Sequence, residues 1–313
     1  MSSVATHLGL DAALTAAVSW AGTGIAASCI WLAMAIVMTL AWASVQRSGK
    51  SGWIDVCWTF GLGVVGVAAA LWWPHAATET AAAPLAQIAP RRWLAALLLA
   101  LWSLRLGTHI MRRTLRHGDD PRYARLREEW GDSQAWRMFA FLQVQALAGV
   151  PLLLAVRLAA ARPDVLGDWR DYLAGLVCLL AIGGEALADR QLRAFGHTPQ
   201  RQQAVCDVGL WRWSRHPNYF FEWMNWLTWP LMALDLAYAE GWLTLLAPLL
   251  MYGLLAHGSG VPPLEAHMAR SRGAAWRAYA ARTSVFFPWP PKRTPAAPLG
   301  PTTKPPADAQ RPS

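Results

Sequence analysis

Seven apolar segments constrain the fold of this 313-residue chain more than any other feature. A helix that crosses a membrane needs about 20 consecutive residues that are mostly apolar. Only 15% of the residues are charged, compared with about 25% in soluble domains. The 20 Trp residues are typical of a protein that meets the membrane–water interface. We therefore expect an all-α polytopic membrane helix bundle with seven spans, at residues 24–45, 53–73, 92–111, 138–157, 172–189, 219–236 and 241–257.

Basic residues are sorted between the two sides that these spans define. One side, which includes the C-terminus, receives 22 of the Lys and Arg residues, and the other receives five. The positive-inside rule predicts that the richer side is cytoplasmic. This sorting accounts for the net charge of +9 without a nucleic-acid partner, so none is expected. Residues 1–22 contain no Lys or Arg, which argues against a cleavable signal peptide, and we expect them to form a periplasmic segment.

The connecting segments differ in character. Residues 112–136 and 190–215 are interpreted as long basic loops, and residues 292–313 as a disordered Pro-rich tail. The transmembrane domain would then occupy residues 23–291. After the last span, an amphipathic helix is expected on the cytoplasmic surface, carrying Leu264, Met268, Ala275 and Tyr279 on one face. It is either an interfacial anchor or a lid that closes a site with Glu265, Tyr279 and Arg282.

The segment from Trp211 to Glu222 joins a basic loop to an apolar helix. Pro217 fixes its own φ and keeps the preceding residue out of the α region, so a helix begins at Pro217. Four residues at helical spacing then share one face: Asn218, Glu222, Asn225 and Trp229. A carboxylate on an otherwise apolar helix needs a polar partner. The expected partners of Glu222 are Arg193, Arg215 and Asn225.

Charged residues inside spans are functional candidates because burying them in a membrane is costly. Arg105, His109, Arg112 and Arg116 form a basic stripe on the third span. Anchoring at the interface explains the outer two, whereas Arg105 lies about two turns deeper. Fixed guanidinium donors at that depth suit phosphates or a carboxylate.

Acidic residues occur in two other spans. Glu185, Asp189 and Arg193 are spaced i, i+4 and i+8 in the fifth span. A local Asp189–Arg193 ion pair would leave the deeper Glu185 without a cation. At the start of the second span, Asp55 is either a partner of the helix dipole or an acid that faces the bundle interior.

The four cysteines lack the spacing of a metal site. We interpret them as free thiols, mostly buried, and expect neither a disulfide nor a metal ion.

Four ordered sequence blocks carry a resemblance to a known family. They are Trp102-Ser-Leu-Arg105-Leu; Asp120-Pro-Arg-Tyr123 with Trp130-Gly131; Asp189-x-Gln191 and Gly209-Leu-Trp followed by Ser214-Arg-His-Pro-Asn-Tyr-Phe-x-Glu222; and Gly260-Val-Pro with Glu265 and a Phe-Pro ending. Over about residues 50–290 the chain resembles the bacterial steroid 5-alpha-reductase-like family, in its domain-of-unknown-function 1295 branch. The same superfamily holds isoprenylcysteine carboxyl methyltransferases, which share Arg-His-Pro-x-Tyr.

The resemblance implies a seven-helix fold in the bacterial inner membrane, with NADPH in a cavity that faces the cytoplasm. The residues it places at that cavity are Arg193, Asn218 and Glu222, with His216, Tyr219, Tyr279 and Arg282 as neighbours. The chain departs from the family pattern at Phe221, where Gly is usual. A bulky side chain there is expected to narrow the cavity or change the substrate.

The first hypothesis is an NADPH-dependent reductase of a C=C bond conjugated to a carbonyl in a steroid-like or isoprenoid-like substrate that enters from the lipid bilayer. Such a reaction needs a donor near the carbonyl oxygen, and Glu222, Asp55 and Tyr219 are the candidates. The phosphates need cations, for which Arg105, Arg193, Arg215 and Arg282 are the candidates.

Two alternatives remain open. One is a membrane methyltransferase that uses S-adenosylmethionine, and the other is a non-catalytic lipid-binding protein. NADPH carries three phosphorus centres and S-adenosylmethionine none, so the basic stripe with Arg105 favours the reductase.

Overall fold

The computed structural model describes residues 2–72, 89–117, 121–199 and 204–292, and the regular elements in these ranges are helices. The α-helices are α1 (Ser2–Ser48), α2 (Trp53–Trp72), α3 (Pro90–His117), α4 (Pro121–Trp130), α5 (Gln134–Ala161), α6 (Trp169–Gly196), α7 (Pro217–Trp226), α8 (Thr228–Ala233), α9 (Leu246–Tyr252) and α10 (Val261–Arg282). Short 3-10 segments cover Gly131–Ser133, Gly209–Arg212 and Ala239–Leu245, and a π-helical turn covers Gly253–His257.

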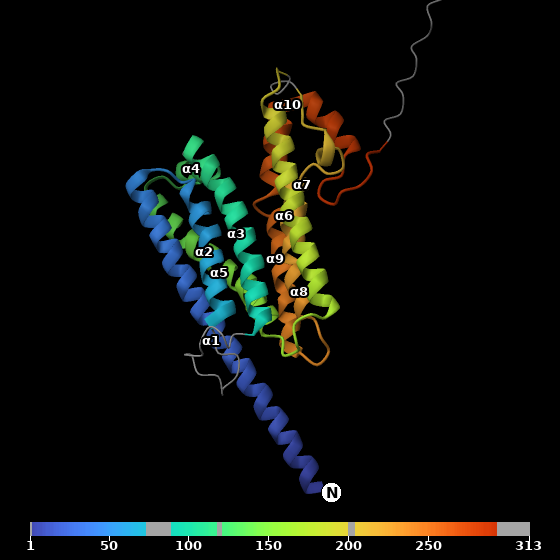
Figure 1. The fold of residues 1–313 in the computed structure, drawn as a ribbon. Helices are drawn as coiled ribbons and strands as arrows, with labels where there is room; N and C mark the ends of the chain where they lie inside the picture. The colour runs from blue at the N-terminus through green and yellow to red at the C-terminus, as the bar shows by residue number, and fades with distance from the viewer. Residues whose placement is uncertain (1, 73–88, 118–120, 200–203, 293–313) are drawn as a thin grey trace, which may run out of the picture.

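The long helices form two groups that lie side by side (Figure 1). In the first group α1, α2, α3 and α5 contact one another, and α4 lies at one end of them. In the second group α6 contacts α7 and α8, and α7 contacts α9. The groups meet where α3 contacts α6 and where α5 contacts α8, α9 and the 3-10 segment Ala239–Leu245. Helix α5 therefore makes most of the contacts between the groups.

The outer surface of the bundle is apolar. Large side chains such as Leu32, Leu40, Val64, Leu97 and Leu180 are exposed. Six helical segments among the described residues are long and apolar enough to cross a membrane: Ser19–Ser48, Trp53–Leu71, Pro90–Arg116, Arg122–Ala161, Trp169–Gly196 and Ala239–Arg282. The chain is a polytopic membrane helix bundle, as the apolar runs predicted.

The expected span at residues 219–236 is not one continuous helix. It is divided into α7 and α8, with Leu227 between them. Pro230 explains the break, because its ring clashes with the carbonyl four residues earlier, at Trp226, the last residue of α7. The α7–α8 pair still runs along the second group, and the chain from Ala239 returns beside it (Figure 1).

Several expected boundaries were wrong. Most of residues 112–136 is helical, because α3 continues to His117 and α4 follows. Likewise α6 continues to Gly196. Helix α1 begins at Ser2 and extends beyond the bundle (Figure 1), so residues 2–22 are in the same helix as the first expected span. The predicted disorder of the tail concerns residues that, apart from Lys292, lie outside the described ranges.

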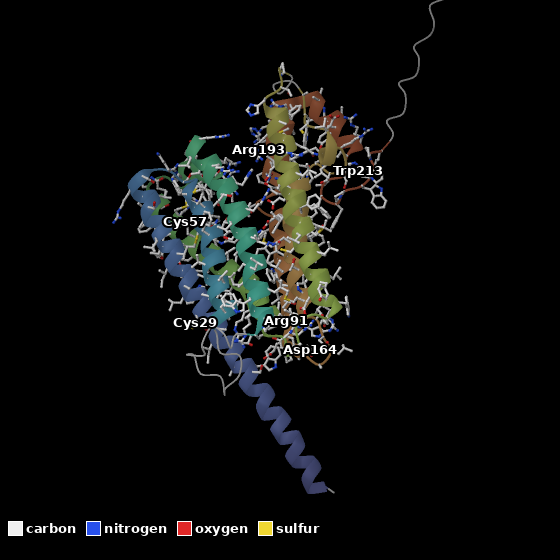
Figure 2. The ribbon with its side chains drawn as sticks, in the orientation of Figure 1. Cys29, Cys57, Arg91, Asp164, Arg193 and Trp213 are labelled. Carbon is white, nitrogen blue, oxygen red and sulfur yellow. The ribbon has the colours of Figure 1, made fainter. Side chains whose placement is uncertain are left out.

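One end of the bundle carries α4, residues 204–216 and α10, and we call it the basic face. Figure 2 places Arg193 and Trp213 near this end and Arg91 and Asp164 near the opposite one. The expected helix after the last span is present as α10, kinked at Gly273, which has a φ of 51°.

The opposite end is closed by a buried ion pair. Arg91 is 2% exposed, and its Nε and Nη2 donate to the two carboxylate oxygens of Asp171 at 2.9 Å. Asp168 caps α6 by accepting from the backbone N–H groups of Arg170 and Asp171, which satisfies donors that a helix start leaves unpaired. These contacts fix the start of α6 against α3.

Candidate functional site

The segment between α6 and α7 is attached to the end of α6. Gln191 Oε1 accepts a hydrogen bond from the Leu210 N–H at 2.9 Å, and Trp211 Nε1 donates to the Ala188 carbonyl at 2.9 Å. Gly209 has a φ of 57°, and a Cβ there would overlap the Gln191 amide, so only glycine fits. These contacts join two parts of the third sequence block and position the start of α7.

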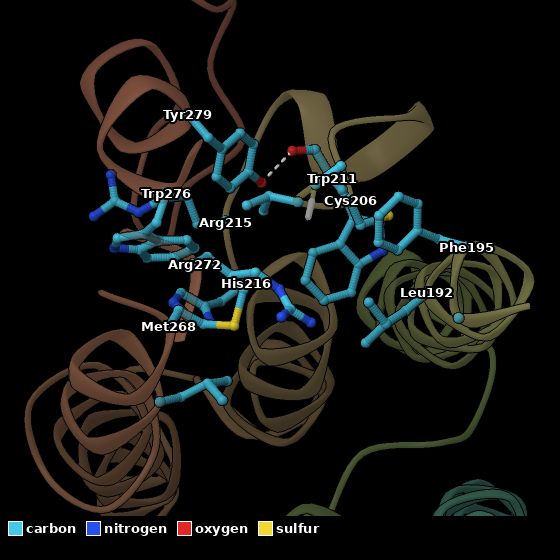
Figure 3. Close-up of a pocket in the computed structure, with 14 residues that line it drawn as sticks. Leu192, Phe195, Cys206, Trp211, Arg215, His216, Met268, Arg272, Trp276 and Tyr279 are labelled. Atoms are coloured by element: carbon cyan, nitrogen blue, oxygen red, sulfur yellow. Dashed lines mark hydrogen bonds between the residues drawn. The ribbon is translucent and has the colours of Figure 1, made fainter. Parts of the chain in front are cut away.

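A pocket lies at the basic face between the end of α6, residues 204–216 and α10 (Figure 3). Its volume is about 530 Å³, within the range of roughly 300–1,000 Å³ that is typical of small-molecule sites. Aromatic and aliphatic side chains form most of its walls. Its aromatic and cationic lining includes Trp211, Arg215, His216, Arg272, Trp276 and Tyr279.

Arg215 holds α10 over this pocket. Its Nε and Nη2 donate to the Glu265 carboxylate at 2.7 and 3.0 Å. Its Nη1 donates to the carbonyls of Ala280 and Thr283, both at 2.9 Å. The guanidinium also lies 5.7 Å from the Trp276 ring centroid. The predicted cation is therefore in the pocket, and much of its donor capacity is used to fix the wall.

His216 is the predicted residue that most clearly needs a further partner. It is 2% exposed, its Nε2 lies 3.2 Å from Glu265 Oε1, and its ring stacks on Tyr219. Its Nδ1 is buried without a hydrogen-bond partner among the described residues. Such an atom is costly unless a ligand or water satisfies it. Asn218, also predicted, is half-buried and does not line this pocket.

Two predicted cofactor-binding residues have other partners. The Tyr279 hydroxyl donates to the Trp211 carbonyl at 2.5 Å, as drawn in Figure 3, so it supports the pocket wall. Arg282 forms an ion pair with Asp207 at the surface. Cys206 also lines the pocket, and burial raises the pKa of its thiol, which keeps it protonated at neutral pH.

Deeper in the bundle, Glu222 is held by two tryptophans. Trp102 Nε1 donates to Glu222 Oε2 at 2.8 Å, and Trp226 Nε1 donates to Oε1 at 3.0 Å. The two indole rings contact edge to face, with their centroids 5.0 Å apart. Indoles therefore occupy the place that the sequence led us to expect for Arg193, Arg215 or Asn225.

Arg105 completes what we call the buried ion cluster, which consists of Trp102, Arg105, Glu185, Asp189, Glu222 and Trp226. Its Nη1 lies 2.6 Å from Glu185 Oε1, and its Nη2 pairs with Asp189. These contacts correct two expectations. Arg105 neutralises carboxylates rather than standing free for a phosphate, and it supplies the cation that Glu185 lacked in the sequence interpretation.

The local Asp189–Arg193 ion pair does not form. Arg193 instead contacts His109, with Nη1 3.1 Å from the His109 Nδ1. The same Nδ1 lies 3.4 Å from Asp189 Oδ2. Arg193 is therefore at the outer end of the buried ion cluster, and it is not among the residues that line the pocket.

Asp55 lies in a separate cluster, away from both the pocket and the buried ion cluster. It pairs with Arg122 of α4 and accepts from the Tyr123 hydroxyl at 2.8 Å. Arg113 is 4.0 Å away, and Gln145 donates to the same hydroxyl. This cluster ties α2 to α4 and α5 in the first group, so the structure does not bring Asp55 together with Glu222 and Tyr219.

Phe221 packs against a glycine of α6. A Cβ built on Gly184 would lie 2.5 Å from Phe221 Cδ1, so the ring fills the space above Gly184. The side chain that departs from the family pattern is therefore accommodated between α6 and α7, next to Glu185.

Sequence reasoning missed residues that the structure brings to these sites. Trp226 follows Glu222 by four residues and so lies on the same helical face, a signal that could have identified it. Trp102 opens one of the sequence blocks, yet no spacing linked it to α7. The pocket residues Arg272 and Trp276 gave no signal beyond their place in an amphipathic helix. All four cysteines are free, as expected, but only Cys178 and Cys206 are buried, and Cys29 is exposed.

Comparison with known proteins assigns the chain to a family. The family described as protein of unknown function DUF1295 matches residues 41–283, most of the chain. The chain belongs to the DUF1295 family. No curated protein and no solved structure matches it. The DUF1295 match includes the buried ion cluster and all the residues that line the pocket.

Proposed function

We propose that this DUF1295 protein is a membrane-embedded, NADPH-dependent reductase of a C=C bond conjugated to a carbonyl. Its substrate would be a lipophilic, steroid-like or isoprenoid-like molecule that enters from the bilayer. We place the protein in the bacterial inner membrane with its basic face and C-terminus in the cytoplasm, as the sorting of Lys and Arg predicts.

The observation that carries this proposal is the position of the pocket relative to Glu222. The pocket lies at the start of α7, where the buried Nδ1 of His216 has no hydrogen-bond partner in the part of the chain that the structure describes. Glu222 lies six residues further along, about 9 Å deeper at 1.5 Å per residue. A dinucleotide bound at the basic face would therefore have its reactive end near the buried acid of the same helix.

The residues of the pocket suit such a cofactor. Trp211 and Trp276 offer aromatic surfaces, and Arg215 and Arg272 offer guanidinium groups, which recognise phosphate. NADPH supplies the hydride for the reaction when it is bound. The contribution of the chain is to orient both partners, to exclude water from the membrane-depth part of the site, and to hold a proton at the Tyr219 phenol or among the buried carboxyl groups around Glu222.

A methyltransferase that uses S-adenosylmethionine is the second candidate, and one observation favours it. Arg105 is engaged by Glu185 and Asp189, and Arg215 is engaged by Glu265. Fewer guanidinium groups are therefore left for phosphates than the sequence indicated. This finding removes the argument from the basic stripe that had favoured the reductase.

Lipid mass spectrometry separates the two candidates whichever lipid is the substrate. Lipids would be extracted from membranes that contain the wild-type protein or the Trp276→Leu variant, after incubation with NADPH or S-adenosylmethionine. The reductase predicts product ions that gain two hydrogens with NADPH. A methyltransferase predicts a gain of one CH2 unit with S-adenosylmethionine, and the absence of both changes in the wild type would contradict both candidates.

A further inference from the structure

The buried ion cluster contains more acid than base. Glu185, Asp189 and Glu222 are 5%, 6% and 6% exposed, and Arg105 contacts the first two. Glu185 and Glu222 lie close enough for their charges to interact. Net negative charge at membrane depth is costly unless a cation or a proton balances it. Carboxylates that share a site also retain a proton more readily than isolated ones.

Glu185 is the group best placed to hold that proton. Arg105 Nη1 is close to Glu185 but forms no hydrogen bond of normal geometry there, whereas Arg105 Nη2 donates to Asp189. Glu222 accepts an indole N–H on each oxygen, and such donors favour the ionised form of a carboxyl group. Glu185 therefore has the weakest stabilisation of its charge.

His109 connects this cluster to the basic face. Its side chain is 29% exposed, and its Nδ1 lies near both Arg193 and Asp189. A guanidinium only donates hydrogen bonds, so contact with Arg193 requires an unprotonated Nδ1. A hydrogen bond to the Asp189 carboxylate, whose Oδ2 lies 3.4 Å away, requires a proton on the same atom. Hydrogen bonds to these two partners therefore belong to different protonation states of one ring.

The charged groups around His109 agree with this alternation. They are Arg105 and Arg113 of α3 and Arg193 and Asp189 of α6, three cations and one carboxylate. A proton on the imidazole is thus drawn toward Asp189 and away from the arginines.

We infer that His109 passes protons from the basic face to Asp189 and on to Glu185. When the Arg193 contact opens, a proton from solvent adds to Nδ1, and Nδ1–H then donates to Asp189 Oδ2. Transfer to that oxygen returns the ring to its neutral form, which accepts again from Arg193. Asp189 then passes the proton to Glu185 and becomes a carboxylate again; the two side chains contact the two Nη atoms of the same Arg105 guanidinium. No electrons move in these steps. The use of the proton rests on the proposed function, because reduction of a C=C bond consumes one proton with each hydride.

Infrared spectroscopy tests this inference in the full-length protein in nanodiscs without any cofactor. At neutral pH the wild type is expected to show a protonated carboxyl band that shifts in D2O and is lost in Glu185→Gln. In His109→Gln the hydrogen–deuterium exchange of that band should be slower by roughly 100-fold, the lower end of what a proton-transfer group contributes. His197→Gln, at the exposed end of α6, is the control and should exchange like the wild type.

A wild-type protein without such a band would overturn the inference, and so would equal exchange in His109→Gln and His197→Gln. If His109→Gln does not fold, Arg193→Gln takes its place. Without the Arg193 contact the His109 ring is free to take up protons. Hydrogen–deuterium exchange of the carboxyl band should therefore be at least as fast as in the wild type, and slower exchange would contradict the inference. These readings do not depend on NADPH, so failure of the proposed function would be recognised separately, by the absence of NADPH binding.

Discussion

Trp102 on α3 donates its indole N–H to Glu222 on α7 at 2.8 Å, although 120 residues separate them in the sequence. The contact crosses the boundary between the two groups of helices. Arg105, one turn further along α3, makes a second crossing to Glu185 and Asp189 of α6. Polar contacts between buried side chains thus connect α3 of the first group to α6 and α7 of the second.

Replacing Glu222 tests how much its hydrogen bonds to the two indoles stabilise the fold. Glu222→Leu should lower the free energy of unfolding, because two buried indole N–H groups lose their acceptor at about 1–3 kcal/mol each. Glu222→Gln keeps one acceptor oxygen and should lose about half as much. Thermal unfolding in detergent measures both effects. A Leu variant as stable as the wild type would show that the indoles do not depend on this carboxylate.

Removing Arg105 should destabilise the protein more than removing an outer member of the same stripe. Arg105→Ala leaves the buried Asp189 carboxylate without its cation, at a cost of about 3–5 kcal/mol. Arg116 is exposed, so Arg116→Ala should change stability by less than about 0.5 kcal/mol. A double-mutant cycle of Arg105→Ala with Asp189→Asn would show coupling between the two sites. Strictly additive losses would contradict the ion pair.

Gly184 and Phe221 pack against each other, so a smaller side chain at position 221 should compensate for a larger one at position 184. Gly184→Ala places a methyl group against the Phe221 ring, and overpacking of this kind costs about 1–3 kcal/mol. Phe221→Leu should relieve part of that loss. Gly183→Ala is the control, because nothing lies within 4 Å of its added Cβ. The thermal unfolding midpoints of Gly184→Ala, Gly183→Ala and the double variant Gly184→Ala with Phe221→Leu would show this order, and equal effects at positions 183 and 184 would refute the packing.

The sequence predicted those features that depend on local patterns. The apolar runs predicted the membrane bundle, and Pro217 predicted the start of α7. The spacing of Glu222 and Asn225 predicted a shared face, and both are buried. Each of these follows from residues within one helix, whose geometry fixes their relative directions.

Partners across helices were not predictable in the same way. Periodicity places Glu222 on a face, but it does not say that Trp102 lies opposite, because this depends on how α3 packs against α7. Charge alone suggested Asp189 and Arg193 as neighbours, whereas the approach of α3 offered Asp189 the closer Arg105. The break at Leu227 had a visible signal in Pro230, which the overall hydrophobicity of residues 219–236 obscured.

Reporter fusions test how α7 and α8 cross the membrane. Fusions after residues 80 and 236 should report the same side, and a fusion after residue 291 the opposite, cytoplasmic side. The exposed Leu236 makes the second position accessible. A fusion at 236 that reports the same side as the one at 291 would mean that the α7–α8 pair does not cross.

The central claim is that the pocket binds NADPH, and titration of the purified protein in nanodiscs with NADPH tests it most directly. Arg272→Gln is the pocket variant. Arg277→Gln, exposed on the same helix, is its control. We predict that NADPH raises the thermal unfolding midpoint of the wild type and of Arg277→Gln. Loss of a charge-assisted contact in Arg272→Gln should raise the NADPH Kd by roughly tenfold, equivalent to about 1.4 kcal/mol. S-adenosylmethionine should have no effect on any of the three. A wild-type protein that does not respond to NADPH, or an Arg272→Gln variant with unchanged affinity, would contradict the assignment of this pocket to the cofactor.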